Sequence, residues 1–190
     1  MVKGERSMKI AVYCSAKDSI PEEYLVLGEQ LGRWIGEQGY TLVYGGATGG
    51  LMSRTSNAAK AAGATVVGVI PPRIIAAGRK ATNCDDLYLV PNMSARKQMM
   101  REMADVIVCL PGSYGTLDEM MDATASGTVG EHRKPVFVLN YNGFYQALID
   151  QIQHMRVLRF IPEQEHYSPV FVDSMDSLKD AILNIEQKKE

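Results

Sequence analysis

The sequence lacks any strong imbalance of charge. Lysine and arginine together number 20 among 190 residues, aspartate and glutamate number 22, and the formal net charge is -2. A chain with this balance has no general attraction for nucleic acid or for an anionic membrane surface. The sequence also has no apolar run of membrane-spanning length, and the polar segment 1–7 is not followed by a hydrophobic stretch of signal-peptide length. We therefore expect a cytoplasmic protein with no nucleic-acid and no membrane partner.

Cysteine and histidine are scarce, with three residues of each. The cysteines have no metal-ligand spacing, and the histidines are scattered, with no close cysteine and no helical i, i+4 pair. These residues are Cys14, Cys84 and Cys109, and His132, His154 and His166. Two of the cysteines lie in predicted buried strands, where a thiol behaves as a small hydrophobe. We predict reduced cysteines and no metal site.

Two common nucleotide-binding motifs are absent. A dinucleotide site needs G-x-G-x-x-G after the first strand and an acidic residue at the end of the second, but these strands end in Cys14-Ser15-Ala16 and Tyr44-Gly45. An ATP-binding loop needs G-x-x-x-x-G-K-[ST], and no lysine follows Gly50. The sequence therefore favours a smaller phosphorylated ligand, and we predict no cofactor.

What the chain does have is two glycine-rich turns that each follow a buried strand and open a helix. Val106 to Leu110 is apolar throughout and leads to Gly112 and Gly115. Thr41 to Tyr44 leads in the same way to the turn 45–50. Glycine lets the backbone approach a ligand, and the first turn of a helix has unpaired N–H groups that favour phosphate. The two turns together predict one shared pocket.

Strands and helices alternate along the whole chain. The strands are too uniformly apolar to face water, which predicts a single-domain α/β fold: a Rossmann-like, doubly wound, mostly parallel sheet with helices on both faces. We expect a flexible N-terminal extension over 1–8 and the domain over 9–188. The predicted strands are 9–14, 41–44, 65–70, 87–90, 106–110, 135–139 and 171–172; the predicted helices are 21–38, 50–62, 94–104, 116–125, 144–155 and 176–188, with 73–86 irregular.

Five motifs in one order resemble the LOG family, the cytokinin riboside 5′-monophosphate phosphoribohydrolases once labelled lysine decarboxylases. They are YGGATGGLM at 44–52, VIPP at 69–72, MSARK at 93–97, LPGSYGTLDE at 110–119 and KPVFVLNYNGFY at 134–145. The resemblance implies a Rossmann-like homodimer that hydrolyses the N-glycosidic bond of a nucleoside 5′-monophosphate, of the AMP or cytokinin riboside type, and releases free base and ribose 5-phosphate. Nothing in the sequence designates the cofactor-binding lysine that a decarboxylase would need.

The chain departs from the family pattern at several positions. Ser113 replaces the second glycine of PGG-x-GT, Ser94 a usual histidine, and Ala47 a third glycine. Ala125 and Gly127 stand where the family has the tryptophan and glutamine of T-W-x-Q. These departures leave the preferred base open. They also leave an alternative open, a catalytically reduced nucleotide-binding or carrier protein on the same fold.

Glu119 has two interpretations. The run from Thr116 to Glu119 fits the capping box T-x-x-E, in which the glutamate reaches back to the helix start. The family match instead favours a catalytic carboxylate that orients water or stabilises the positive charge on the ribose as the glycosidic bond breaks, by analogy with glycoside hydrolysis.

Arg96 and Lys97 also have two interpretations. They can form the solvated face of a helix whose buried side carries methionines, or the match at MSARK can make Arg96 a catalytic residue that grips phosphate or ribose. Arg96 is not the acid that protonates the departing base, because it keeps its proton near neutrality. The predicted catalytic pair is thus Arg96 and Glu119. The predicted substrate- and phosphate-binding residues are Gly45, Gly46, Gly49, Gly50, Met93, Lys97, Gly112, Ser113, Tyr114, Gly115 and Thr116.

Overall fold

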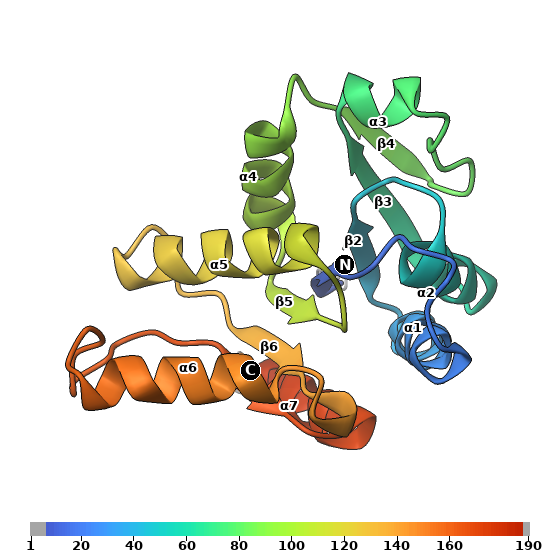
Figure 1. Cartoon of the computed structure of the whole chain (residues 1–190). Coiled ribbons are helices and arrows are strands. Elements are labelled where there is room, and N and C mark those ends of the chain that lie inside the picture. Colours follow the sequence, from blue (N-terminus) through green and yellow to red (C-terminus); the bar gives the residue numbers. More distant parts are fainter. Residues whose placement is uncertain (1–6, 188–190) are drawn as a thin grey trace, which may run out of the picture.

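The computed structural model describes residues 7–187, which form a seven-stranded sheet with the strand order β4-β3-β2-β1-β5-β6-β7 (Figure 1). Every pairing between neighbouring strands is parallel. The strands are β1 (Lys9–Tyr13), β2 (Thr41–Tyr44), β3 (Thr65–Ile70), β4 (Asp86–Leu89), β5 (Val106–Cys109), β6 (Val136–Leu139) and β7 (Val170–Val172). The prediction of a parallel α/β sheet is confirmed.

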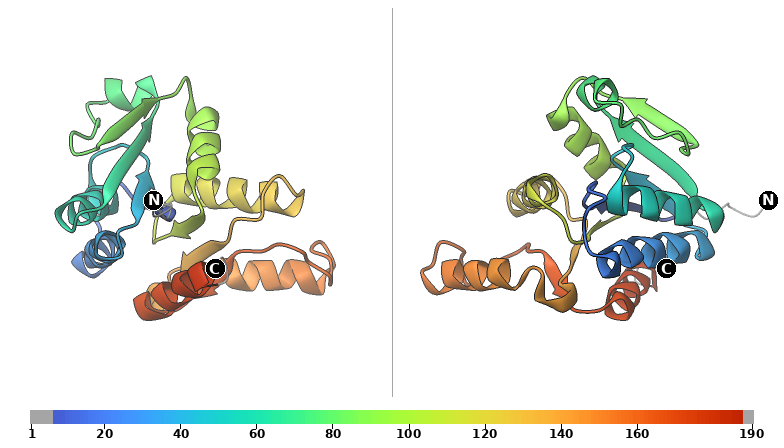
Figure 2. Two further views of the ribbon diagram at one scale, coloured as in Figure 1. Left: turned by 180° about the vertical axis from the view of Figure 1, so that it is seen from behind. Right: turned by 45° about the vertical axis from the view of Figure 1, so that its right-hand side comes forward.

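Helices cover both faces of this sheet (Figure 2). One core lies between the sheet and α1, α2 and α7, and the other between the sheet and α4, α5 and α6. The helices are α1 (Glu22–Glu37), α2 (Gly50–Ala61), α3 (Pro72–Ala76), α4 (Met93–Met103), α5 (Tyr114–Thr128), α6 (Gln146–Val157) and α7 (Met175–Gln187), with a 3-10 turn, η1, at Tyr141–Gly143. Within residues 7–187 no helix is both long and apolar enough to cross a membrane.

The central strands are buried on both faces because successive side chains point to opposite sides of the sheet. In β1, Ile10 and Val12 enter the core under α1 and α2, whereas Ala11 and Tyr13 enter the core under α4 and α5. All four are at most 1% exposed. The continuous apolar runs in the sequence therefore reflect two cores rather than one.

Helices α1 and α2 pack closely because glycines on α1 leave room for the backbone of α2. A Cβ at Gly32 would lie 2.2 Å from the carbonyl oxygen of Thr55, and one at Gly36 would lie 2.8 Å from that of Ala59. A Cβ at Gly28 would likewise lie 3.2 Å from the carbonyl oxygen of Leu51, so the contact extends to the start of α2, next to the turn between β2 and α2.

The chain changes direction between β1 and β5. From β1 it builds β2, β3 and β4 outward on one side, then returns through α4 to place β5 against the other edge of β1. Such a switch point leaves a crevice at the carboxyl ends of the strands, where α/β proteins bind ligands. The segments after β1, β2 and β5 all end at this crevice.

Most predicted elements agree with the structure to within one or two residues, but two short helices were missed. The segment 73–86, predicted as irregular, begins within helix α3 (Pro72–Ala76), and the 3-10 turn η1 precedes α6. Of the proposed extension 1–8, residues 1–6 lie outside the described residues, as does Lys188. Met8 is only 6% exposed and belongs to the core, so the packed part of the chain includes it.

Candidate active site

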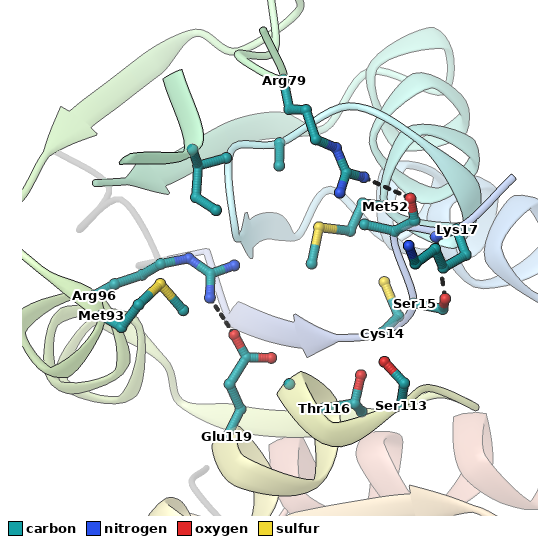
Figure 3. A pocket seen from close by; sticks show the side chains of 14 residues that line it. Cys14, Ser15, Lys17, Met52, Arg79, Met93, Arg96, Ser113, Thr116 and Glu119 are labelled. Atoms are coloured by element: carbon teal, nitrogen blue, oxygen red, sulfur yellow. Dashed lines mark hydrogen bonds and ion pairs between the residues drawn. The ribbon is translucent and has the colours of Figure 1, made fainter. Parts of the chain in front are cut away.

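A cavity of about 190 Å³ opens at the carboxyl ends of the strands, at the switch point between β1 and β5 (Figure 3). Both glycine-rich turns reach it, as the sequence predicts, through Ala47 on one side and Ser113 and Gly115 on the other. The lining residues are Cys14, Ser15, Ala16, Lys17, Ala47, Met52, Ile74, Arg79, Met93, Arg96, Ser113, Gly115, Thr116 and Glu119.

Arg96 and Glu119 form a buried ion pair in the wall of this cavity. Arg96, on the first turns of α4, is 4% exposed and Glu119, on α5, is 3% exposed. The Nη1 group of Arg96 donates to Oε1 of Glu119, and its Nε group donates to the carbonyl oxygen of Val69 at 3.1 Å. Arg96 therefore belongs to the buried side of α4, and the interpretation of this residue as part of a solvated face is wrong.

The carboxyl of Glu119 sits in an environment that works against its charge. Burial raises the pKa of Glu119 above the ordinary value of 4.5, and the nearby positive charge of Arg96 offsets part of this effect. Two buried charges with opposite sign, held in contact beside a cavity, are an arrangement that structural stability alone does not require.

The capping-box interpretation of Thr116 and Glu119 is also wrong. Helix α5 begins at Tyr114, two residues earlier than predicted, with Ser113 at the N-cap and no side-chain capping bond. The N–H of Leu117 already bonds to the carbonyl of Ser113, so Thr116 lies inside the first turn and Glu119 is too far along the helix to cap it. Glu119 turns inward to Arg96 instead.

The N-terminus of α5 forms one end of the cavity. Ser113, Gly115 and Thr116 line it, and the positive end of the helix dipole points into it. Ser113 has φ -99°, an ordinary value for any residue, so its substitution for the family's glycine causes no backbone strain. Tyr114 is 90% exposed and does not line the cavity, and Gly112 packs on the side chain of Thr116.

The first glycine-rich turn contributes differently from the second. The N–H of Gly49 donates to Oγ of Ser53 at 2.7 Å, and the N–H of Gly50 donates to Oδ1 of Asp18 at 2.8 Å. The start of α2 is thus already occupied by side chains of the protein. Gly46 has φ +61°, a backbone conformation that favours glycine, and Gly45 lies against the guanidinium of Arg96.

Lys97 lies outside the cavity. Its Nζ group bonds to Asp118 at 2.8 Å and lies 3.3 Å from Asp122, so it joins α4 to α5 on their outer side. Met93, which begins α4, does line the cavity. Of the two basic residues in MSARK, Arg96 lines the cavity and Lys97 does not.

The family departures at 94, 125 and 127 also lie outside the cavity lining. Ser94 is exposed on α4. Gly127 packs against the ring of Tyr167, whose Cε1 atom would lie 2.2 Å from a Cβ at that position. The absence of the family's glutamine therefore reflects packing between α5 and the segment before β7, not a change in the cavity wall.

Sequence reasoning missed the residues that follow β1 and the arginine that holds them. Ser15, Ala16 and Lys17 line the cavity, and Nη2 of Arg79 donates to the carbonyl oxygens of Ala16 at 2.5 Å and Thr48 at 2.7 Å. These residues lie in loops with no periodic pattern. The signal that could have found them is position, because the segment after β1 borders the switch point.

Comparison with known proteins identifies the family of this chain. A family model described as "possible lysine decarboxylase" matches residues 52–182. The chain is 39% identical over 153 residues to the cytokinin riboside 5′-monophosphate phosphoribohydrolase of Rhodococcoides fascians, covering 80% of this chain and 77% of that protein. The chain belongs to the LOG family. The LOG enzyme of Oryza sativa subsp. japonica is 32% identical over 182 residues, with 96% of this chain and 74% of that protein covered.

Solved structures share the fold of this LOG-family chain. The molybdenum cofactor binding protein of Rippkaea orientalis superposes with a TM-score of 0.72 at 23% identity, with 95% of this chain and 98% of that chain covered. The Moco carrier protein of Chlamydomonas reinhardtii superposes with a TM-score of 0.71 at 22% identity, with 96% and 99% covered. At such low identity these structures share the Rossmann-like architecture and say nothing further about the ligand.

Proposed function

We propose that this protein is a phosphoribohydrolase, which hydrolyses the N-glycosidic bond of a nucleoside 5′-monophosphate to free base and ribose 5-phosphate. The observation that carries the proposal is the buried Arg96–Glu119 pair, which faces the same cavity as the free N-terminus of α5. The names of the LOG-family relatives support this reaction, and they support AMP or a cytokinin riboside 5′-monophosphate as the substrate.

The two ends of the cavity differ in chemistry, and this difference supports one orientation of the substrate. The N-terminus of α5 suits the phosphate. The apolar side chains of Met52, Ile74 and Met93 suit a flat base. The ribose then lies between these ends, beside Glu119.

The reaction breaks the bond between C1′ of the ribose and a nitrogen of the base. The base departs with the bonding electrons, and positive charge develops on the ribose, as in glycoside hydrolysis. The carboxylate of Glu119 stabilises that charge and orients the water whose oxygen bonds to C1′. Arg96 keeps the carboxylate in place, and the water supplies the proton that the base gains overall.

The proposal includes a homodimer, as the family resemblance implies, with α4 near the contact. Met93 and Met121, on α4 and α5, are 40% and 37% exposed. Sedimentation at micromolar concentration tests this part, since a monomer there would contradict it. The proposal also includes a cytoplasmic location, where the unpaired Cys14 and Cys109 stay reduced.

Incubation with a panel of nucleoside 5′-monophosphates, followed by chromatography for free base, tests the reaction. We expect base and ribose 5-phosphate in equal amounts from at least one nucleotide, and much less from the matching nucleoside. Binding of nucleotides without release of any base would contradict the enzyme and support the alternative, a carrier on the same fold.

A further inference from the structure

Lys17 is a cation at the phosphate end of the cavity, and the sequence motifs did not point to it. It follows β1, and in Figure 3 its side chain extends into the cavity below Arg79, on the side of Ser15 and Ser113. A second, apolar hollow nearby shares Ser15, Lys17 and Ser113 as a common wall. Lys17 therefore stands at the edge of the space beside the N-terminus of α5.

The loop that carries Lys17 is held at three points. The N–H of Lys17 donates to Oγ of Ser15 at 3.1 Å, and Nη2 of Arg79 donates to the carbonyl of Ala16. The carboxylate of Asp18 accepts from the N–H of Gly50. The backbone position of Lys17 is thus fixed before any ligand arrives, so little ordering entropy remains to be lost apart from that of its side chain.

The ammonium group of Lys17 has no acceptor among the described residues, unlike those of Lys60 and Lys97, which are paired with carboxylates. Its neighbour Asp18 is engaged with the start of α2. A lysine that protrudes into a cavity while the adjacent carboxylate is bound elsewhere keeps its charge available for an anion.

The opposite wall carries a threonine whose hydroxyl also lacks a hydrogen-bond partner. Thr116 is 3% exposed and lines the cavity, and no hydrogen bond joins its Oγ1 atom to any residue in 7–187. Ser113, the exposed N-cap residue of α5, makes no side-chain capping bond either. Both residues line the cavity, so their hydroxyls are available to donate hydrogen bonds to a ligand.

We propose that Lys17 binds the 5′-phosphate of the substrate, opposite the hydroxyl of Thr116 and the N-terminus of α5. This inference rests on the proposed function for the identity of the phosphate ester. Asp18 occupies the N-terminus of α2, so that helix start does not bind an anion. The cavity therefore binds one phosphate, between the segments that follow β1 and β5. Arg79 is a positioning residue here, because its Nη2 group is committed to the carbonyls of Ala16 and Thr48.

Binding of ribose 5-phosphate, measured by calorimetry, tests the proposal without requiring turnover. Lys17→Met removes the charge and keeps most of the side chain, and Lys17→Arg restores the charge. Lys80→Met is the matched control, because Lys80 is exposed, directly follows Arg79 and does not line the cavity. We expect Lys17→Met to weaken binding on the order of tenfold and Lys17→Arg to recover most of it. The control should bind like the native protein.

With AMP as substrate, we expect Lys17→Met to raise KM by a similar factor and to leave kcat within about twofold, because the phosphate is bound alike in the ground and transition states. Equal affinity of the native protein and Lys17→Met for ribose 5-phosphate would overturn the proposal, and so would no measurable binding by the native protein. If the native protein binds ribose 5-phosphate through Lys17 but releases base from no nucleotide, the proposed reaction fails and the phosphate site stands.

Discussion

The guanidinium group of Arg96 lies directly against the backbone of Gly45, in the space that a side chain there would fill. A Cβ at Gly45 would be 1.7 Å from Nη2 of Arg96. Gly45 does not have a positive φ, so its backbone conformation is open to other residues and space alone is the constraint. The absence of a side chain at Gly45 thus leaves space for the guanidinium of Arg96, which pairs with Glu119.

Gly45→Ala is expected to displace the guanidinium and lower kcat on the order of tenfold or more, because a shift of about 1 Å at a catalytic pair is costly. The fold should persist, since the displaced atoms are the end of a flexible side chain. Steady-state kinetics and a thermal melt check this. Gly115→Ala is the comparison: its Cβ would meet no atom of the protein within 4 Å but faces the cavity, so KM should rise instead. An unchanged kcat in Gly45→Ala would show that the position of the Arg96 guanidinium does not depend on a glycine at 45.

Glu119→Gln is expected to lower turnover by a factor on the order of a hundred or more, the range typical of a positioned acid–base group. The amide keeps the size of the side chain and still accepts a hydrogen bond from Arg96, but it lacks the charge that stabilises the ribosyl cation. Base release per minute, with ribose 5-phosphate affinity as the control for an intact site, measures the effect. Native turnover in this variant would remove Glu119 from the mechanism.

The rate of base release should fall on the acid side as Glu119 becomes protonated. Burial raises the pKa of this carboxyl, so the fall in kcat/KM with decreasing pH should be centred above 4.5 rather than at it. A pH profile of kcat/KM for the native protein checks this. A profile with no acid-side loss down to pH 4.5 would mean that ionised Glu119 is not required.

The effect of Gly127→Ala on the free energy of unfolding is expected to depend on the residue at 167. The substitution should destabilise the protein that has Tyr167 and stabilise the Tyr167→Ala variant. In the native background the new Cβ meets the ring of Tyr167, and we expect a loss of about 1–3 kcal/mol in the free energy of unfolding. In the Tyr167→Ala background the clash is gone, and alanine should stabilise α5 by up to about 1 kcal/mol through its higher helix propensity. Denaturant unfolding of the four proteins measures this coupling, and equal effects in both backgrounds would refute it.

His132 should make the protein less stable as the pH falls. Its Nε2 atom pairs with the carbonyl of Ala123 at 2.8 Å and its Nδ1 atom accepts from the N–H of Lys134 at 3.2 Å, a pattern that requires the neutral ring. Burial lowers the pKa of His132 below 6.5, so the unfolded chain takes up a proton first and stability declines as pH falls through this range.

His132→Gln can form both hydrogen bonds and does not titrate. The difference in Tm between pH 7.5 and pH 5.5 should therefore be smaller in this variant than in the native protein. Equal differences in the two proteins would show that His132 does not contribute to the pH dependence.

Local sequence pattern was enough to predict a parallel sheet and the succession of strands and helices along the chain. Apolar runs such as Val106 to Leu110 identify a strand buried on both faces, and glycines after the strands identify the turns that meet at the cavity. Short elements without a hydrophobic period, α3 and η1, were missed because nothing in a window of five residues distinguishes them from a loop.

Contacts between distant residues could not be predicted in this way. The capping box at Thr116 is a valid local pattern, but tertiary contact with Arg96, which is 23 residues away, decides where Glu119 points. Gly45 and Gly127 are glycines because of Arg96 and Tyr167, and only the structure reveals those partners. Lys17 and Arg79 lie in loops that have no hydrophobic period. They border the cavity because the chain reverses its direction of strand addition at β1.

The pairing of β1 with β5 has a consequence for the order of folding. The segments from β1 to α3 can collapse as the chain leaves the ribosome, but β1 gains its second neighbour only when Val106–Cys109 has been made. Helix α5, which carries Thr116 and Glu119, comes later still. A nascent chain therefore has Arg96 before it has Glu119, and the candidate site is complete only after β5 pairs with β1, a long-range contact of the kind that forms slowly. A phosphate ester that contacts both the loop after β1 and the N-terminus of α5 binds only the folded chain, and so it would stabilise the native state by mass action.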